Sequence, residues 1–137
     1  SFGKDHPKVA TRLNNLAILL KANNRLVEAE PLLLRALAID EASFGKNQPD
    51  IARDLNNLAS LLQATNRLAE AEPLIRRGFD ILLKSTVANG HRHPYLDTLL
   101  VNYRALLKAR GDTDGQIRAK ITALDAEDGL SITESAQ

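Results

Sequence analysis

The sequence repeats itself at a fixed interval of 42 residues, and this repeat constrains the fold more than any other feature. The run 2–4 (Phe-Gly-Lys) returns at 44–46, and the run 13–17 (Leu-Asn-Asn-Leu-Ala) returns at 55–59. Residues 2–43 and 44–85 share 24 identities in 42 positions. A weaker third copy follows at an offset of 45. Tandem units of this length predict an array in which each unit packs against its neighbours.

Each unit carries two apolar stripes at helical spacing. In the first unit one stripe runs through Val9, Leu13, Leu16 and Leu20, and the other through Leu26, Ala29, Leu33, Ala36 and Leu37. Spacings of three and four residues place such side chains on one face of a helix. Asn23 and Asn24 separate the stripes, and asparagine favours turns. We therefore predict two helices joined by a tight turn in each unit.

The third unit is expected to end the array. Its first helix is predicted from about 94 to 110, ending at Gly111. The helix that follows has a narrow apolar stripe of Ile117, Ile121 and Leu124, with polar residues elsewhere. A helix with one apolar and one polar face is what the end of a stack requires. The last helix is therefore predicted to be a cap.

Small residues at matching places point to a particular kind of helical repeat. Ala17 and Ala59 lie at the centre of the first helices, and Ala29 and Ala71 lie early in the second helices. This spacing resembles the tetratricopeptide repeat, in which small side chains let paired helices approach closely. The connection Phe-Gly-Lys-x-x-Pro, the core Leu-Asn-Asn-Leu-Ala and the start Glu-Ala-Glu-Pro-Leu resemble the long, 42-residue subtype found in kinesin light chain and its bacterial relatives.

The resemblance implies an all-α fold, a right-handed α-α superhelix (solenoid) of three helical hairpins and about six helices. The tetratricopeptide-repeat domain is expected at 1–126, with repeats at about 2–43, 44–88 and 89–126. Residues 127–137 are expected to form a flexible, polar, acidic tail. Two departures stand out. Gly78 replaces Ala36 inside a helix, and Arg104 replaces the small Ala17 and Ala59, which predicts looser packing of the third hairpin.

The same resemblance implies a peptide-binding groove lined by the first helix of each hairpin. Residues flanking the buried stripes should face this groove, and the candidate binding residues are Asn14, Lys21, Arg53, Asn56, Ser60, Gln63 and Lys108. Asparagine can donate to and accept from a peptide backbone. Lysine and arginine suit an acidic peptide or a terminal carboxylate. We expect a structural role for a second set, comprising Asn15, Asn57, Asn102, Ala17, Ala59, Ala29 and Ala71.

Other classes of function find little support in the sequence. The chain has no Cys, and two histidines at 91 and 93 fall short of the three or four ligands of a usual metal site. It shows no phosphate-binding loop or nucleophile elbow, and the carboxylate pairs Glu28/Glu30 and Glu70/Glu72 recur with the repeat and are expected in solvent. A net charge of +1 argues against nucleic acid as a partner, and no apolar run is long enough for a membrane span. We therefore predict no catalysis, no cofactor and no metal.

The predicted function is a protein- or peptide-interaction module, a scaffold or adaptor that binds an extended or short helical, possibly acidic, peptide. The alternative is a structural spacer or a self-association domain within a larger protein. The chain contains no Met, which predicts that it is a piece of a longer or processed protein. No signal peptide opens it, so the cytoplasm is the default expectation for its location.

Overall fold

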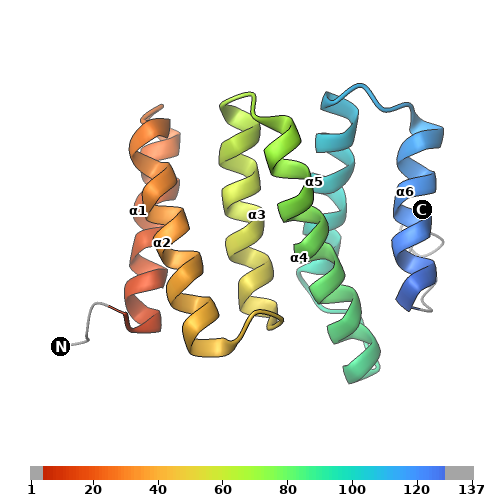
Figure 1. Ribbon diagram of the computed structural model, residues 1–137, viewed down its shortest axis with the longest axis horizontal. Coiled ribbons are helices and arrows are strands. Elements are labelled where there is room, and N and C mark those ends of the chain that lie inside the picture. The colour runs from red at the N-terminus through yellow and green to blue at the C-terminus, as the bar shows by residue number, and fades with distance from the viewer. Residues whose placement is uncertain (1–4, 129–137) are drawn as a thin grey trace.

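The computed structural model describes residues 5–128, and within this range the chain forms six α-helices and no strand. Their bounds are α1 Pro7–Ala22, α2 Leu26–Phe44, α3 Pro49–Ala64, α4 Leu68–Asn89, α5 Leu96–Ala109 and α6 Asp114–Asp128. Figure 1 shows them side by side as a row of helical pairs in chain order, the arrangement of a solenoid. The predicted fold class is confirmed. Residues 129–137, which hold most of the predicted acidic tail, lie outside the described range.

The helix ends follow from the residues that repeat. Pro7 and Pro49 are the first residues of α1 and α3, where the missing N–H of proline costs no hydrogen bond. The turns inside the first two hairpins contain Asn24 and Asn66, with φ of 60° and 61°. Asparagine adopts this left-handed conformation more readily than most residues. The same turn chemistry therefore closes both hairpins.

The inserted residues of the third unit lengthen a helix before they form a loop. α4 has 22 residues, whereas α2 has 19, and α4 ends at Asn89 before Gly90 with a φ of 74°. The next helix begins at Leu96, two residues after the predicted start at Pro94. In this loop the backbone N–H of Tyr95 donates to His93 Nδ1 at 3.0 Å, which holds the chain short of the helix.

Small side chains lie where paired helices meet. Ala17 and Ala59 in the first helices and Ala29 and Ala71 in the second helices are all buried. One core cluster continues from hairpin to hairpin, because α2 packs on α3 and α4 packs on α5. Tyr103 is fully buried in this cluster. Most of the core is thus continuous through the three hairpins, and a second, small cluster of Ala10, Ala36 and Ile39 lies between α1 and α2.

One residue of the first predicted stripe is not buried. Leu16 is 46% exposed, although Leu58 at the equivalent place in α3 is 3% exposed. Val9 and Leu13 are half-buried, and Leu20 is buried. The sequence pattern is right for a helix that has neighbours on both sides. In the described chain, no helix covers the side of α1 where Leu16 lies.

The third hairpin is more open than the other two. Figure 1 shows α6 as a separate column, whereas α1 and α2, or α3 and α4, cross closely. Arg104 of α5 is half-buried at the place of the buried alanines Ala17 and Ala59. Ile117 and Ile121 are buried and Leu124 is half-buried, as predicted for a cap, and the stripe packs on α4 as well as α5.

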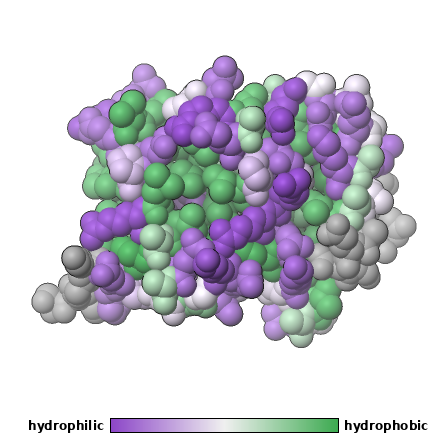
Figure 2. Space-filling view, in the orientation of Figure 1, coloured by the Kyte–Doolittle hydropathy of each residue, from purple (hydrophilic) through white to green (hydrophobic). Residues whose placement is uncertain are grey.

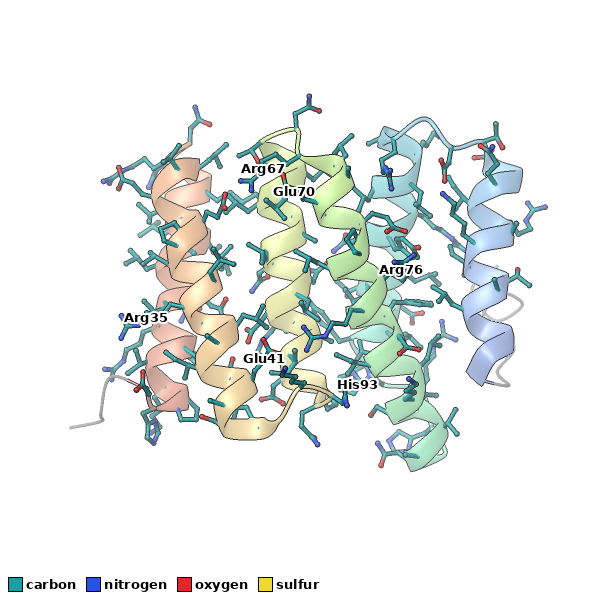
Figure 3. The ribbon with its side chains drawn as sticks, in the orientation of Figure 1. Arg35, Glu41, Arg67, Glu70, Arg76 and His93 are labelled. Carbon is teal, nitrogen blue, oxygen red and sulfur yellow. The ribbon has the colours of Figure 1, made fainter. Side chains whose placement is uncertain are left out.

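Ion pairs join the first two hairpins along their second helices. Arg67, which directly precedes α4, pairs with Glu30 of α2 and with Glu70 of α4, and Arg77 pairs with Glu41 at 3.0 Å. Figure 3 shows Arg67 and Glu70 at the turn between α3 and α4. The guanidinium of Arg67 holds the pKa of Glu70 below its usual value. Exposed pairs of this kind contribute little to stability individually, but they fix the relative position of the hairpins.

The face formed by α2 and α4 is apolar over α2. Val27 and Leu34 of α2 are exposed, and the equivalent places on α4 hold Ala69 and Arg76. Figure 2 looks onto this face and shows hydrophobic atoms gathered in its left half, over α2 and its border with α3. Of the helices in residues 5–128, none is both long and apolar enough to cross a membrane.

Candidate functional site

The candidate binding residues lie on the first helices, α1, α3 and α5, whose side of the molecule we call the first-helix face. Arg53 and Lys108 are exposed, and Lys21, Ser60 and Gln63 are half-buried. Lys21 of α1 donates to the hydroxyl of Ser60 on α3, so two of the candidates meet across hairpins. Lys108 lies near the end of α5, and none of the hydrogen bonds described links it to the other candidates.

Asn14 and Asn56 are buried, and their amides are engaged inside the protein. Asn14 Nδ2 donates to Asp54 Oδ1 at 2.9 Å, and Asn56 Nδ2 donates to the hydroxyl of Tyr95 at 2.9 Å. Each bond reaches from one hairpin to the next. These two residues therefore support the first-helix face from within, and each leaves little surface for a direct contact.

The second asparagine of each pair completes the connection in the reverse direction. Asn57 donates to Asn14 Oδ1 at 3.3 Å, and Asn102 donates to Asn56 Oδ1 at 2.9 Å. Both partners are side chains of the preceding hairpin. Asn15 has the same place in α1 and is exposed. A ladder of asparagine pairs thus joins neighbouring hairpins.

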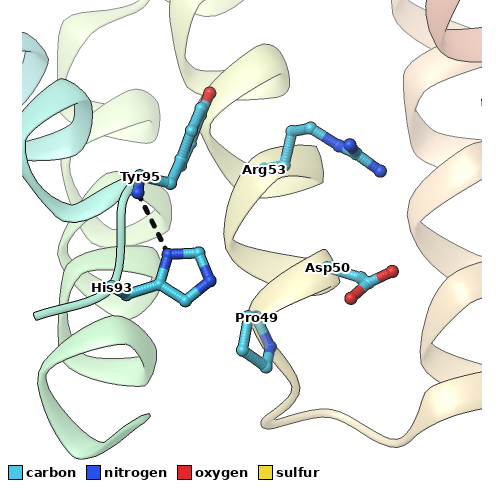
Figure 4. Close-up of a pocket in the computed structure, with 5 residues that line it drawn as sticks. All are labelled: Pro49, Asp50, Arg53, His93 and Tyr95. Carbon is cyan, nitrogen blue, oxygen red and sulfur yellow. Dashed lines mark hydrogen bonds between the residues drawn. The ribbon is translucent and has the colours of Figure 1, made fainter. Parts of the chain in front are cut away.

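A pocket of about 240 Å³ opens beside this ladder, between α3 and the loop that precedes α5. Figure 4 shows its lining, which consists of Pro49, Asp50, Arg53, His93 and Tyr95. His93 Nδ1 accepts the N–H of Tyr95, which requires that this ring nitrogen carry no proton. Burial raises the pKa of the Tyr95 phenol, against the opposing effects of Asn56 and Arg53. The phenol is therefore neutral and bonded to Asn56.

Sequence reasoning found Arg53 but missed the other walls of the pocket. By the repeat offsets of 42 and 45, His93 corresponds to His6 of the first repeat and Gln48 of the second, whereas Tyr95 corresponds to Lys8 and Asp50. The register therefore places both residues at the start of the first helix of the third unit. What they contact, however, follows only from the fold.

A second depression lies on the opposite side, between α2 and the start of α4. It measures about 450 Å³ and is lined by Leu26, Val27, Glu30, Pro31, Leu34, Thr65 and Arg67. Most of its lining is apolar, and Arg67 and Glu30 within it are paired with each other. Among residues 5–128, no three histidine, aspartate or glutamate side chains gather as a metal site would need.

Glu72 differs from the solvated carboxylate that the repeat suggested. It is buried, accepts a hydrogen bond from the Tyr103 hydroxyl at 3.1 Å, and lies 3.7 Å from Arg76. Burial and the adjacent carboxylate of Glu72 both raise the pKa of Tyr103. The two groups therefore belong to the packing of α4 on α5.

Comparison with known proteins agrees with this architecture. A family model described as tetratricopeptide repeat matches residues 9–84. A crystal structure from Podosopora anserina, assigned as a kinesin light chain with nearly identical repeats of this type, is similar with a TM-score of 0.72 and 22% sequence identity. The similarity covers 93% of this chain but only 60% of that one. No curated protein sequence matches the chain significantly. With over half of its length matched by the family model, the chain belongs to the tetratricopeptide repeat family and resembles kinesin light chain.

Proposed function

We propose that this protein is a non-catalytic scaffold or adaptor module that binds an extended or short helical acidic peptide on its first-helix face. Tetratricopeptide repeats are in general protein-interaction modules and not enzymes. The observation that carries the proposal is Arg53, an exposed guanidinium at the mouth of the pocket that Tyr95 and His93 complete.

The charges along the face support an acidic ligand. Lys21, Arg53 and Lys108 come from three successive first helices. An arginine can bind a carboxylate through two parallel hydrogen bonds, which gives both energy and orientation. In the proposal Arg53 binds a carboxylate of the peptide, Tyr95 and Pro49 offer apolar contact, and Ser60 and Gln63 provide further hydrogen bonds.

Asn14 and Asn56 enter the proposal as supports of the face. Asn56 holds the hydroxyl of Tyr95, which forms one wall of the pocket. Asn14 holds the α1–α3 contact beside the bond between Lys21 and Ser60. Their removal is expected to loosen the face and weaken binding indirectly.

Fluorescence anisotropy with a labelled peptide rich in Asp and Glu tests the proposal. Arg53→Glu should weaken binding by about tenfold or more, as expected for loss of a charge-assisted hydrogen bond. Arg118→Glu on α6 is the matched control, because it makes the same charge change at an exposed place far from the face. The control should bind within about twofold of the wild type.

Salt and a milder variant make the test selective. Affinity should fall as ionic strength rises, because exposed charges are screened. Arg53→Gln keeps the length of the side chain and removes only its charge, so it should also weaken binding if the protein is folded by circular dichroism. Equal affinity of Arg53→Gln, Arg118→Glu and wild type would reject the proposed site.

The alternative function, a spacer or self-association domain, is favoured by a different observation. Leu16 and Leu19 on α1 are exposed apolar side chains on a helix whose partner residues on α3 are buried. Light scattering separates the two, because a stable dimer at low micromolar concentration favours assembly and a monomer favours the peptide module.

A further inference from the structure

α4 ends at the only Asn-Gly pair in the sequence. Asn89 is its last residue, and Gly90 follows with a φ of 74°, a left-handed conformation that glycine adopts without strain. Both residues are exposed, and α4 reaches past the ends of the neighbouring helices (Figure 1). Every other asparagine is followed by a residue whose side chain crowds its backbone nitrogen. This pair is therefore the place where a backbone nitrogen can most readily attack the preceding amide side chain.

Few hydrogen bonds hold the two groups that would react. The N–H of Gly90 donates to Thr86 O at 3.0 Å, in the last turn of the helix. Among the described residues, the side chain of Asn89 is held by one hydrogen bond, from its Nδ2 to Ser85 Oγ at 3.2 Å. Bonds at a helix end open in local fluctuations far more often than bonds in its middle. The nitrogen and the side chain can therefore meet without the unfolding of α4.

His91 lies where it stabilises the charge that develops in this attack. Its Nδ1 is 3.1 Å from the carbonyl oxygen of Asn89, which belongs to the same peptide group as the nitrogen of Gly90. A carbonyl oxygen only accepts, so the ring nitrogen carries the hydrogen and donates. When the Gly90 nitrogen loses its proton, negative charge spreads onto that oxygen, and a donor aimed at it is stabilising. The contact therefore favours the deprotonated, nucleophilic form of the peptide group.

We propose that Asn89 and Gly90 form a self-modification site, at which Asn89 is converted to aspartate and isoaspartate through a cyclic imide with the help of His91. The Gly90 nitrogen gives its proton to solvent base and forms a bond to Cγ of Asn89. The bond from Cγ to Nδ2 breaks, and this nitrogen takes a proton from water and leaves as ammonia. A second water then opens the ring at either carbonyl. In sum one water is consumed and one ammonia is released, with no change of oxidation state.

The product alters the end of α4 and the loop after it. A carboxylate at a helix C-terminus adds negative charge where the last carbonyl groups already concentrate it. Isoaspartate also adds one carbon to the main chain shortly before His93 and Tyr95, which line the pocket beside Arg53. Any effect on peptide affinity rests on the function proposed above, whereas the conversion itself does not.

Mass spectrometry of tryptic fragments tests the proposal. Cleavage after Lys84 and Arg92 isolates residues 85–92, in which Asn89 is the only asparagine. The folded chain is kept in mildly alkaline buffer and compared with a sample digested at the start. Conversion exchanges an amide for an acid and yields two products of equal mass, which chromatography separates. Asn66, exposed in the turn between α3 and α4, is the matched control, and Asn89 should convert at least about tenfold faster.

The variant His91→Leu isolates the contribution of the folded structure. It removes the donor to the carbonyl oxygen of Asn89 and leaves the Asn-Gly pair in place, and His91 is exposed, so the variant should fold as judged by circular dichroism. In the native state it should slow conversion by about threefold or more, the effect expected for a solvent-exposed hydrogen bond. In concentrated urea it should convert within about twofold of the wild type, because unfolding separates the groups.

The outcomes against the proposal are equally definite. Conversion of Asn89 no faster than that of Asn66 would overturn the site. Aspartate without isoaspartate would overturn the cyclic imide, since a ring opens at both carbonyls whereas direct hydrolysis of the amide gives aspartate alone. Equal native-state rates for His91→Leu and the wild type would overturn the role of His91.

Discussion

The two contacts between successive hairpins use the same geometry and different chemistry. The first contact, of α2 with α3, buries Asp40 and Asp54, and the second contact, of α4 with α5, has Leu82 and Leu99 at the equivalent places. The first is tied by Asn14 and Asn57, the second by Asn56 and Asn102. The asparagine ladder is thus common to both contacts, while the residues beneath it are free to change.

The first contact buries two carboxyl groups, and we call it the polar contact, in distinction from the second, apolar contact. Burying both carboxyl groups in ionised form costs stability unless they share a proton. Asp54 is 1% exposed, and its Oδ2 has no donor among the described groups when both carboxyls are ionised. Burial and the facing Asp40 raise the pKa of Asp54 to about 8, against the opposing effects of Asn14 and Arg53. A protonated Asp54 can donate to Asp40, which satisfies both groups. The apolar contact needs no such arrangement, so the two contacts should differ in stability and in pH dependence.

The largest expected difference lies in the core of the contacts. Phe79 and Tyr103 pack with ring centroids 6.1 Å apart at the second contact, and Leu37 and Leu58 have these places at the first. Phe79→Ala should lower the free energy of unfolding by about 4 kcal/mol and Leu37→Ala by about 2.5 kcal/mol. Urea denaturation of the two variants measures both values. A larger loss for Leu37→Ala would contradict the prediction that truncation costs more at the aromatic pair of the second contact.

The next effect is the pH dependence of the first contact. The pKa of Asp54 is raised in the folded state, so the folded protein holds a proton that the unfolded chain releases above about pH 4. Stability should therefore fall as pH rises from about 4 to about 8 and level off above that range. Asp54→Asn keeps an acceptor for Asn14 and supplies a permanent donor to Asp40. It should stabilise the protein by about 2 kcal/mol at pH 8.5 and by little at pH 4.5.

Thermal denaturation across this pH range checks the prediction. Asp50→Asn is a suitable control, because Asp50 is an exposed carboxylate on the same helix. The control should follow the wild-type curve. If the wild-type protein gained stability between pH 5 and pH 8 in this comparison, the shared proton would be ruled out.

A smaller effect separates the two asparagines of the ladder. Asn14→Ala leaves the buried Asp54 without its donor, whereas Asn56→Ala leaves Tyr95 and Asn102, which are half-buried and can bond water. We expect losses of about 1.5 and about 0.5 kcal/mol, respectively, in urea denaturation at pH 8.5. Asn15→Ala, at an exposed place, is the control and should lose less than either. Equal losses of unfolding free energy for Asn14→Ala and Asn56→Ala would show that the asparagine bonds contribute equally to the two contacts.

Most of the fold could be predicted from the sequence because the same pattern of apolar residues, prolines and turn asparagines occurs in both of the first two repeats. The positions of Pro7, Pro49, Asn24 and Asn66 fix where helices begin and turn. The exposure of Leu16 could not be predicted in this way. A repeated pattern describes an average unit, while burial at the first unit depends on what stands next to it.

The candidate site was harder to predict for a related reason. Helical spacing places Arg53, Asn56 and Asn14 on one face, but it does not say which of them reach solvent. The bonds of Asn14 and Asn56 run to Asp54 and Tyr95 in other hairpins. Those partners are 40 and 39 residues away in sequence, so only the stacking of hairpins brings them together. Whether Arg53 binds a peptide is still a prediction.

The smallest effect concerns Gly78, which lies on a buried face of α4. A Cβ on Gly78 would lie 3.3 Å from the carbonyl oxygen of Ala52 and 3.4 Å from Leu99 Cδ1. At the first contact Ala36 takes this place, next to Ala10 and with Asp54 where Leu99 stands. Gly78→Ala gains about 1 kcal/mol of helix propensity, and crowding against Ala52 and Leu99 should return about half of it. We therefore expect a net gain of about 0.5 kcal/mol in urea denaturation, since the tip of Leu99 can move and the first hairpin already accommodates alanine. A loss above about 1 kcal/mol would mean that α4 approaches α3 and α5 too closely for any side chain, and that the apolar contact requires glycine where the polar one does not.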